Sequence, residues 1–241
     1  MIEVQGVTKK FGDFTAVKGL TFTAGQGEVV GMLGENGAGK TTTLRMISTV
    51  LKPTHGSISV GGKDAVRQAE EVRKQVGILF GGETGLYDRL TARENIRYFG
   101  KLYGLEQSVV EARTESLAKR FDMTRYLDKR VGGFSKGMKQ KVAIARSLIH
   151  DPNVVLFDEP TSGLDITSAN VIRQLLGEFK QEGRTVIFSS HIMSEVERLC
   201  DRVVILHRGE LQYNGTLDAL YEQNGTNDLD RIFMEMVGEG Q

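Results

Sequence analysis

The sequence contains almost no cysteine: Cys200 is the only one in 241 residues. A single cysteine cannot form an intramolecular disulfide, and it has no second cysteine nearby with which to bind zinc. The chain is therefore neither a disulfide-stabilised scaffold nor a cysteine-based zinc protein. We expect a reducing compartment, and we interpret Cys200 as a core thiol, since free cysteines are commonly buried.

An excess of charge of either sign is also absent. Lys plus Arg and Asp plus Glu both number 31, which gives a formal net charge of zero. Proteins dedicated to nucleic-acid binding usually carry a basic surplus, so we expect no nucleic-acid partner.

Long hydrophobic runs are missing as well. The longest apolar stretches, such as residues 154–157 and 203–206, are far shorter than the ~20 residues that a membrane-spanning helix requires. Residues 1–4 lack the charged and then apolar layout of a signal peptide. We expect one globular domain over residues 1–241 with no membrane span.

Glycine, in contrast, is abundant, with 29 residues in the chain. Residues 28–33 form a short apolar run that leads into a glycine-rich segment and then into a helical pattern over residues 40–50. Further strand-like runs at residues 76–80, 154–157 and 185–189 alternate with helical patterns. This alternation is typical of a parallel sheet covered by helices.

Two other segments complete the expected fold. The opening segments, residues 2–7 and 20–24, have the alternating pattern of strands. Residues 91–130 have apolar residues at helical spacing, and we expect a helical subdomain inserted at about residues 85–150. The predicted fold class is α/β: a core with a mainly parallel sheet covered by helices, an N-terminal antiparallel β part and an inserted helical lobe.

The glycine-rich segment matches a phosphate-binding pattern. Residues 34–41 read Gly-Glu-Asn-Gly-Ala-Gly-Lys-Thr, which fits G-x-x-x-x-G-K-[ST]. Its glycines let backbone amides converge on phosphate oxygens, Lys40 adds a positive charge, and Thr41 offers a hydroxyl to Mg²⁺. We call residues 34–41 the phosphate loop, and with this motif the predicted α/β core is a P-loop NTPase core. The alternative is a flexible glycine-rich turn.

A second motif narrows the choice among enzymes with a phosphate loop. The apolar run at residues 154–157 ends in Asp158 and Glu159. Taken alone, this motif would be interpreted as a strand ending in solvated acids. Together with the phosphate loop, it predicts that Asp158 holds Mg²⁺ and that Glu159 polarises the attacking water. A GTPase would also need an Asn-Lys-x-Asp segment, which is absent.

A third motif lies between these two. Residues 134–140 read Phe-Ser-Lys-Gly-Met-Lys-Gln and precede an apolar-periodic helix, with Ser135 placed as its N-cap. We call residues 134–140 the signature segment. The order of phosphate loop, signature segment, residues 158–165 (Asp-Glu-Pro-Thr-Ser-Gly-Leu-Asp) and residues 189–191 (Ser-Ser-His) resembles the ATP-binding subunit of ABC transporters over nearly the whole chain.

That resemblance implies an ATPase that uses ATP and Mg²⁺. In this family two ATPase domains pair head to tail, so each ATP lies between one phosphate loop and the signature segment of the partner. The second subunit is expected to be another copy of this chain. The implied ATP-binding residues are Phe11, Gly34, Asn36, Gly37, Ala38, Gly39, Lys40, Thr41 and Thr42. Those implied to contact the partner's ATP are Ser135, Lys136, Gly137, Met138 and Asp165.

The resemblance also assigns the catalytic and metal-binding residues. Glu159, His191 and Lys40 are the implied catalytic residues, and Thr41 and Asp158 the implied Mg²⁺ ligands. Taken alone, His191 would be a polar surface residue, and Phe11, the expected adenine-stacking aromatic, would be a core residue.

Two segments depart from the family pattern. The signature segment has Phe-Ser-Lys-Gly-Met where Leu-Ser-Gly-Gly-Gln is usual, although Ser135 and Gly137 are retained. The glutamine expected in the Q-loop is replaced by Gly82. We expect Glu83 to substitute as a metal ligand, and the alternative is that it is a solvated acid in a flexible loop.

Residues 87–95 and 232–235 resemble the drug- and ion-exporting branch of the family, and within it the sodium-extruding NatA type. The expected function is therefore to power solute export, with Na⁺ as the solute, through a separate membrane permease. The chain would lie at the cytoplasmic face of the cell membrane. The alternatives are export of a drug or another solute, or an ABC ATPase that acts without a permease.

Overall fold

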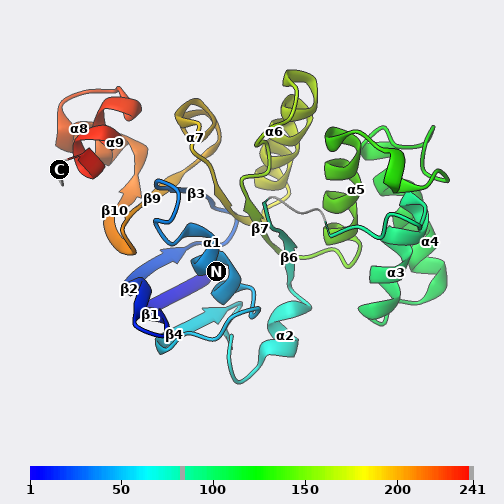
Figure 1. Ribbon diagram of the computed structural model, residues 1–241, viewed down its shortest axis with the longest axis horizontal. Helices are drawn as coiled ribbons and strands as arrows, with labels where there is room; N and C mark the ends of the chain where they lie inside the picture. The colour runs from blue at the N-terminus through cyan, green and yellow to red at the C-terminus, as the bar shows by residue number, and fades with distance from the viewer. Residues whose placement is uncertain (82–84, 239–241) are drawn as a thin grey trace.

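The central element is a six-stranded sheet, described by a computed structural model that covers residues 1–81 and 85–238 (Figure 1). Its strands follow the order β10-β9-β3-β8-β7-β6, and all neighbours are parallel except β9 and β10. The strands are β3 (Val29–Leu33), β6 (Val76–Leu79), β7 (Val154–Asp158), β8 (Thr185–Ser189), β9 (Arg202–His207) and β10 (Glu210–Thr216). Every residue of β3, β7 and β8 is buried, as expected for apolar runs inside a helix-covered sheet.

A smaller antiparallel sheet is formed by the N-terminal part of the chain. It has the order β2-β1-β4-β5, with β1 (Ile2–Phe11), β2 (Phe14–Ala24), β4 (His55–Val60) and β5 (Lys63–Asp64). Helix α1 (Lys40–Ile47) packs between the two sheets, where Leu44 and Ile47 share a core with Phe22 and Leu156. The predicted antiparallel β part is confirmed.

The opposite face of the large sheet carries the second core. Residues alternate along β7: Val154 and Leu156 face the first core, whereas Val155 and Phe157 face the second. Helices α6 (Ile166–Gln181), α7 (Met193–Leu199) and α9 (Leu229–Gly238) contribute to this second core, and α2 (Ala69–Arg73) and α8 (Leu217–Asn224) complete the helices outside the lobe.

The helical lobe lies between β6 and β7 in sequence and to one side of the sheet in space (Figure 1). It contains α3 (Ala92–Leu102), α4 (Gln107–Arg120), a short 3₁₀ helix (Val131–Gly133) and α5 (Lys136–Leu148). A capping box starts α3, because the Thr91 side chain accepts from Glu94 N–H and the Glu94 carboxylate accepts from Thr91 N–H. Residues 121–130, which we expected to be mostly helical, contain no α-helix.

The end of helix α1, the turn between β9 and β10, and the surroundings of Cys200 complete the description of the fold. Helix α1 ends at Ile47, earlier than the predicted residue 50, because Thr49 has a left-handed backbone with φ +68°. Strands β9 and β10 form a hairpin, and its two turn residues, Arg208 and Gly209, both have positive φ. Cys200 packs against the second core, where desolvation by burial raises the pKa of its thiol.

Within residues 1–81 and 85–238, every helix is too short or too polar to cross a membrane.

Candidate nucleotide-binding site

The phosphate loop connects the end of β3 to the start of α1, which is the strand–turn–helix context that the motif requires. Gly37 and Gly39 have φ of +84° and +103°, a region that side chains rarely allow. A Cβ atom on Gly39 would also lie only 2.8 Å from the carbonyl oxygen of Ala16. The glycines therefore permit both the backbone path and the close approach of β2.

Lys40 is the first residue of α1 and is only 5% exposed. Its Nζ donates hydrogen bonds to the carbonyl oxygens of Gly34 (2.6 Å) and Glu35 (3.1 Å), so the side chain folds back over the loop. Burial lowers the pKa of the Lys40 ammonium, while the nearby carboxylates of Glu159 and Asp158 act in the opposite direction. The loop thus holds a poorly solvated cation at the position where phosphate oxygens would bind.

Thr41 and Asp158 bring oxygen atoms together beside this cation. Thr41 Oγ1 donates to Asp158 Oδ2 at 2.7 Å, and Ser189 Oγ donates to Asp158 Oδ1 at 2.6 Å. The hydroxyl and carboxylate are the hard oxygen ligands that Mg²⁺ prefers, so this pair is chemically suited to the ion.

Glu159 follows directly and has a left-handed backbone with φ +46°. Its N–H donates to Ser189 Oγ at 2.9 Å and to the Ser189 carbonyl oxygen at 3.2 Å, and these bonds hold it in that conformation. Its Oε2 lies 3.5 Å from His191 Nδ1, and the His191 side chain is 57% exposed. His191 is therefore a surface histidine that nonetheless faces the acid.

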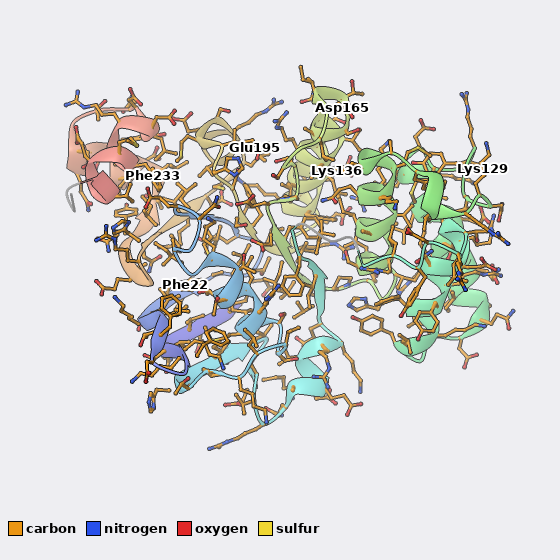
Figure 2. The ribbon with its side chains drawn as sticks, viewed as in Figure 1. Phe22, Lys129, Lys136, Asp165, Glu195 and Phe233 are labelled. Carbon is orange, nitrogen blue, oxygen red and sulfur yellow. The ribbon has the colours of Figure 1, made fainter. Side chains whose placement is uncertain are left out.

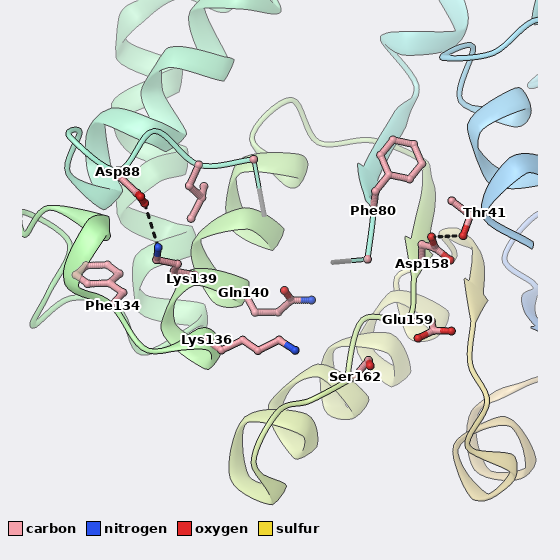
Figure 3. Close-up of a pocket in the computed structure, with 13 residues that line it drawn as sticks. Thr41, Phe80, Asp88, Phe134, Lys136, Lys139, Gln140, Asp158, Glu159 and Ser162 are labelled. Carbon is pink, nitrogen blue, oxygen red and sulfur yellow. Dashed lines mark hydrogen bonds and ion pairs between the residues drawn. The ribbon is translucent and has the colours of Figure 1, made fainter. Parts of the chain in front are cut away.

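Three of the residues described above, Thr41, Asp158 and Glu159, line a cavity of about 860 Å³ between the sheet and the helical lobe (Figure 3). Thr41, Asp158 and Glu159 stand on the side of the sheet, and Lys136 and Gln140 extend from α5 on the other side. Gln140 Nε2 donates to the carbonyl oxygen of Pro160 at 2.8 Å, so α5 is tied to the segment after Glu159.

The signature segment starts α5 as predicted, with Ser135 as N-cap accepting from Met138 N–H at 3.3 Å. Ser135 is exposed, whereas Gly137 is buried against Ser168, which leaves no room for a Cβ atom. The Asp165 carboxylate accepts from Ser168 N–H and Oγ, and these hydrogen bonds lower its pKa. Lys136 and Asp165 mark the adjoining starts of α5 and α6 in Figure 2.

Phe11 lies at the end of β1 and is 47% exposed. The alternative that Phe11 is a core residue is therefore wrong. Its ring is open to a stacking partner on the protein surface, with Lys9 Nζ 5.1 Å from the ring centroid.

The other expected residues differ in exposure and coverage. Asn36 is exposed in the phosphate loop, Ala38 is buried in it, and Thr42 is half-buried in the first turn of α1. Gly82 and Glu83 lie outside the residues that the structure describes, so the Q-loop prediction stays a prediction.

The sequence reading missed one polar group near the site. Glu195 in α7 is 2% exposed, and its carboxylate accepts hydrogen bonds from Thr161 and Ser190. The available signal was its place four residues after His191, at the start of a helix that follows a buried strand.

Comparisons with known proteins agree with the site described above. The family model described as ABC transporter matches residues 17–162, and one described as AAA domain, putative AbiEii toxin, Type IV TA system matches residues 130–197. The ABC transporter ATP-binding protein NatA of Bacillus subtilis (strain 168) is 55% identical over 100% of this chain and 99% of its own length. The linearmycin resistance ATP-binding protein LnrL of the same organism is 36% identical over 99% of this chain and 76% of its own.

Two solved structures are also similar to this chain. The ATP-binding subunit of an ABC transporter superposes with a TM-score of 0.90 at 34% identity, covering 98% of this chain and 99% of its own. A dimeric ATP-binding cassette in a post-hydrolysis state, bound to ADP and Pi, superposes with a TM-score of 0.81 at 28% identity, covering 90% of this chain and 98% of its own. The chain belongs to the ABC transporter family and is an ATP-binding subunit with ATPase activity.

Proposed function

We propose that this subunit powers the export of a solute, with Na⁺ as that solute, through a separate membrane permease at the cytoplasmic face of the membrane. The observation that carries the proposal is the end-to-end similarity to NatA at 55% identity, since the sequence resembles the sodium-extruding type. We also propose that residues 1–241 act as one ATP-binding domain with a helical subdomain inserted at about residues 85–150.

The site geometry supports a division of roles. Lys40 would bind the phosphates, and Glu159 would orient and polarise the attacking water, because its carboxylate lies in the same cavity as Thr41 and Asp158. His191 would assist at the same point, given its position beside Glu159. We propose Mg²⁺ as the cofactor held by Thr41 and Asp158; when bound, it would neutralise charge on the phosphates.

We further propose that two copies of the chain form the working ATPase. Ser135 and Asp165 are both exposed, and Gly137 lies between them and against Ser168, so the signature segment and the start of α6 form one face. Ser135, Lys136, Gly137, Met138 and Asp165 would contact the partner's ATP from this face. A dimeric arrangement is known for structural relatives.

Mixing two inactive variants tests the composite site. Lys40→Ala disables the phosphate loop and Ser135→Arg blocks the signature segment, so each homodimer should be inactive. A heterodimer keeps one intact site, and an equal mixture should recover about a quarter of wild-type turnover, because about half of its dimers carry one working site of two. ATP-driven heterodimerisation, followed with differently labelled subunits, is the second readout. Failure of both readouts would contradict the composite site.

Co-purification and a transport assay test the permease partner and the identity of the solute. The chain should co-purify with a membrane permease, and the pair reconstituted in vesicles should move ²²Na⁺ against its gradient when ATP is added. Vesicles with Glu159→Gln protein are the matched control. Transport of a hydrophobic drug without ²²Na⁺ would favour the drug-export alternative. The similarity to LnrL, a linearmycin resistance ATP-binding protein, supports that alternative. Absence of any permease would favour an ATPase that acts alone.

A further inference from the structure

Glu195, labelled in Figure 2, is buried, and its carboxylate connects three parts of the chain around the proposed catalytic residues. Its Oε2 accepts hydrogen bonds from Thr161 Oγ1 and Ser190 Oγ, both at 3.0 Å. Its Oε1 accepts from Arg173 Nε at 3.0 Å and forms an ion pair with the same guanidinium at 2.9 Å. Burying a charge is costly unless it is paired and hydrogen-bonded, and Glu195 meets both conditions.

The two hydroxyl groups belong to the two loops that carry the proposed chemistry. Thr161 is two residues after Glu159, and Ser190 directly precedes His191. Both loops leave the ends of adjacent parallel strands, where Asp158 pairs with Ser189. Glu195 therefore joins the two loops, and Glu159 Oε2 and His191 Nδ1 lie 3.5 Å apart across the same two loops.

The third connection reaches α6. Arg173 lies within α6, and its Nη1 also donates to Asn170 Oδ1 at 2.8 Å in the preceding turn. Because α6 begins with Asp165 as its N-cap, the same carboxylate is linked through one helix to the face proposed to meet the partner subunit. Movement of either loop or of α6 relative to the other two would require at least one of these hydrogen bonds to break.

We propose that Glu195 is a positioning residue for ATP hydrolysis. Its carboxylate fixes the distance between the Glu159 loop and the His191 loop, and it transmits movements of α6 to both. The proposal rests on the roles proposed above for Glu159 and His191. Displacing a reacting group by about 1 Å can cost on the order of 10² in rate, so a loss of this bracing should slow chemistry without removing any group that touches ATP.

The chemistry of the site explains why a carboxylate is required. The two oxygens of Glu195 accept from two hydroxyls and one guanidinium. A glutamine of the same shape has a single acceptor oxygen and no charge to pair with Arg173. Because this one oxygen cannot serve both the two hydroxyls and Arg173, Glu195→Gln should loosen the attachment of the two loops to α6 while keeping the volume of the side chain.

The test measures kcat and ATP affinity separately. Glu195→Gln should lower kcat about 10- to 100-fold and leave the Kd for Mg-ATP within about twofold of wild type. Thr161→Val and Ser190→Ala should each lower kcat in part, and their effects should not add to that of Glu195→Gln, since all three remove the same bracing. Glu197→Gln, an exposed acid on the same helix, is the matched control and should keep wild-type kcat.

A second variant separates positioning from stability. In Arg173→Met/Glu195→Gln both charges are removed, so the thermal midpoint should recover while kcat stays low. Recovery of kcat together with the thermal midpoint would overturn the proposal, because the only role of Glu195 would then be to neutralise the charge of Arg173. If Glu195→Gln does not fold, wild-type kcat in the Thr161→Val/Ser190→Ala variant would overturn it equally.

Glu159→Gln distinguishes failure of the Glu195 proposal from failure of the proposed role of Glu159. An inactive Glu159→Gln beside a fully active Glu195→Gln would overturn the Glu195 proposal alone. Normal hydrolysis in Glu159→Gln would refute the role of Glu159, and the positioning role with it.

Discussion

Replacing Glu159 by glutamine is expected to slow ATP hydrolysis by about 10²- to 10⁴-fold, the usual contribution of a general base. The amide keeps the shape of the side chain but cannot take up a proton from the attacking water. ATP binding should be unchanged, because Lys40, Thr41 and the phosphate loop are intact. The variant should therefore accumulate as an ATP-bound dimer, which size-exclusion chromatography in the presence of ATP detects. The rate of phosphate release measures the loss of hydrolysis.

The matched control is Glu222→Gln, an exposed acid on α8 far from the cavity, which should behave as wild type. Turnover near the wild-type rate in Glu159→Gln would contradict the assignment of Glu159. The result bears on geometry as well, since Glu159 is held by Ser189 in a left-handed backbone that glutamine can keep equally well.

The second large effect is expected for Lys40→Ala, which should weaken the binding of ATP. Hydrogen bonds to charged groups contribute about 1.5–3 kcal/mol, so loss of the ammonium should weaken ATP binding about 10- to 150-fold. Burial has already removed much of the water from this ammonium and lowers its pKa, so phosphate would meet a cation with little hydration to lose. Isothermal titration calorimetry with ATP and with ADP measures the loss.

Lys101→Ala, which removes an exposed lysine from α3, is the control for the change in net charge. Its affinity for ATP should equal that of wild type, and both variants should show similar far-UV circular dichroism. Unchanged ATP affinity in Lys40→Ala would contradict the phosphate-loop interpretation.

Local patterns in the sequence predicted the elements that hold the site. Short apolar runs indicated β3, β7 and β8, and the phosphate loop follows from its glycines and Lys40. The cap at Ser135 was also predictable, because a serine before an apolar-periodic segment is a known helix start. In each case the determining interactions lie within a few residues of one another.

Features that depend on distant parts of the chain were not predictable in this way. Gly137 contacts Ser168, and Glu195 contacts Thr161, across separations that no local pattern encodes. The early end of α1 is another example, because Thr49 adopts a left-handed backbone that threonine does not favour. Burial of a single acid at position 195 is likewise a property of the packed molecule.

The order of strands in the large sheet has a consequence during synthesis on the ribosome. Strand β3 pairs with β8 and β9, which are made more than 150 residues later, and it leads directly into the phosphate loop. At ~5–20 residues per second, β3 waits roughly eight to thirty seconds for its neighbours. During that time its apolar residues and both of its edges are open to wrong partners, so the nascent chain needs shielding by α1, the small sheet or a chaperone until β8 and β9 emerge.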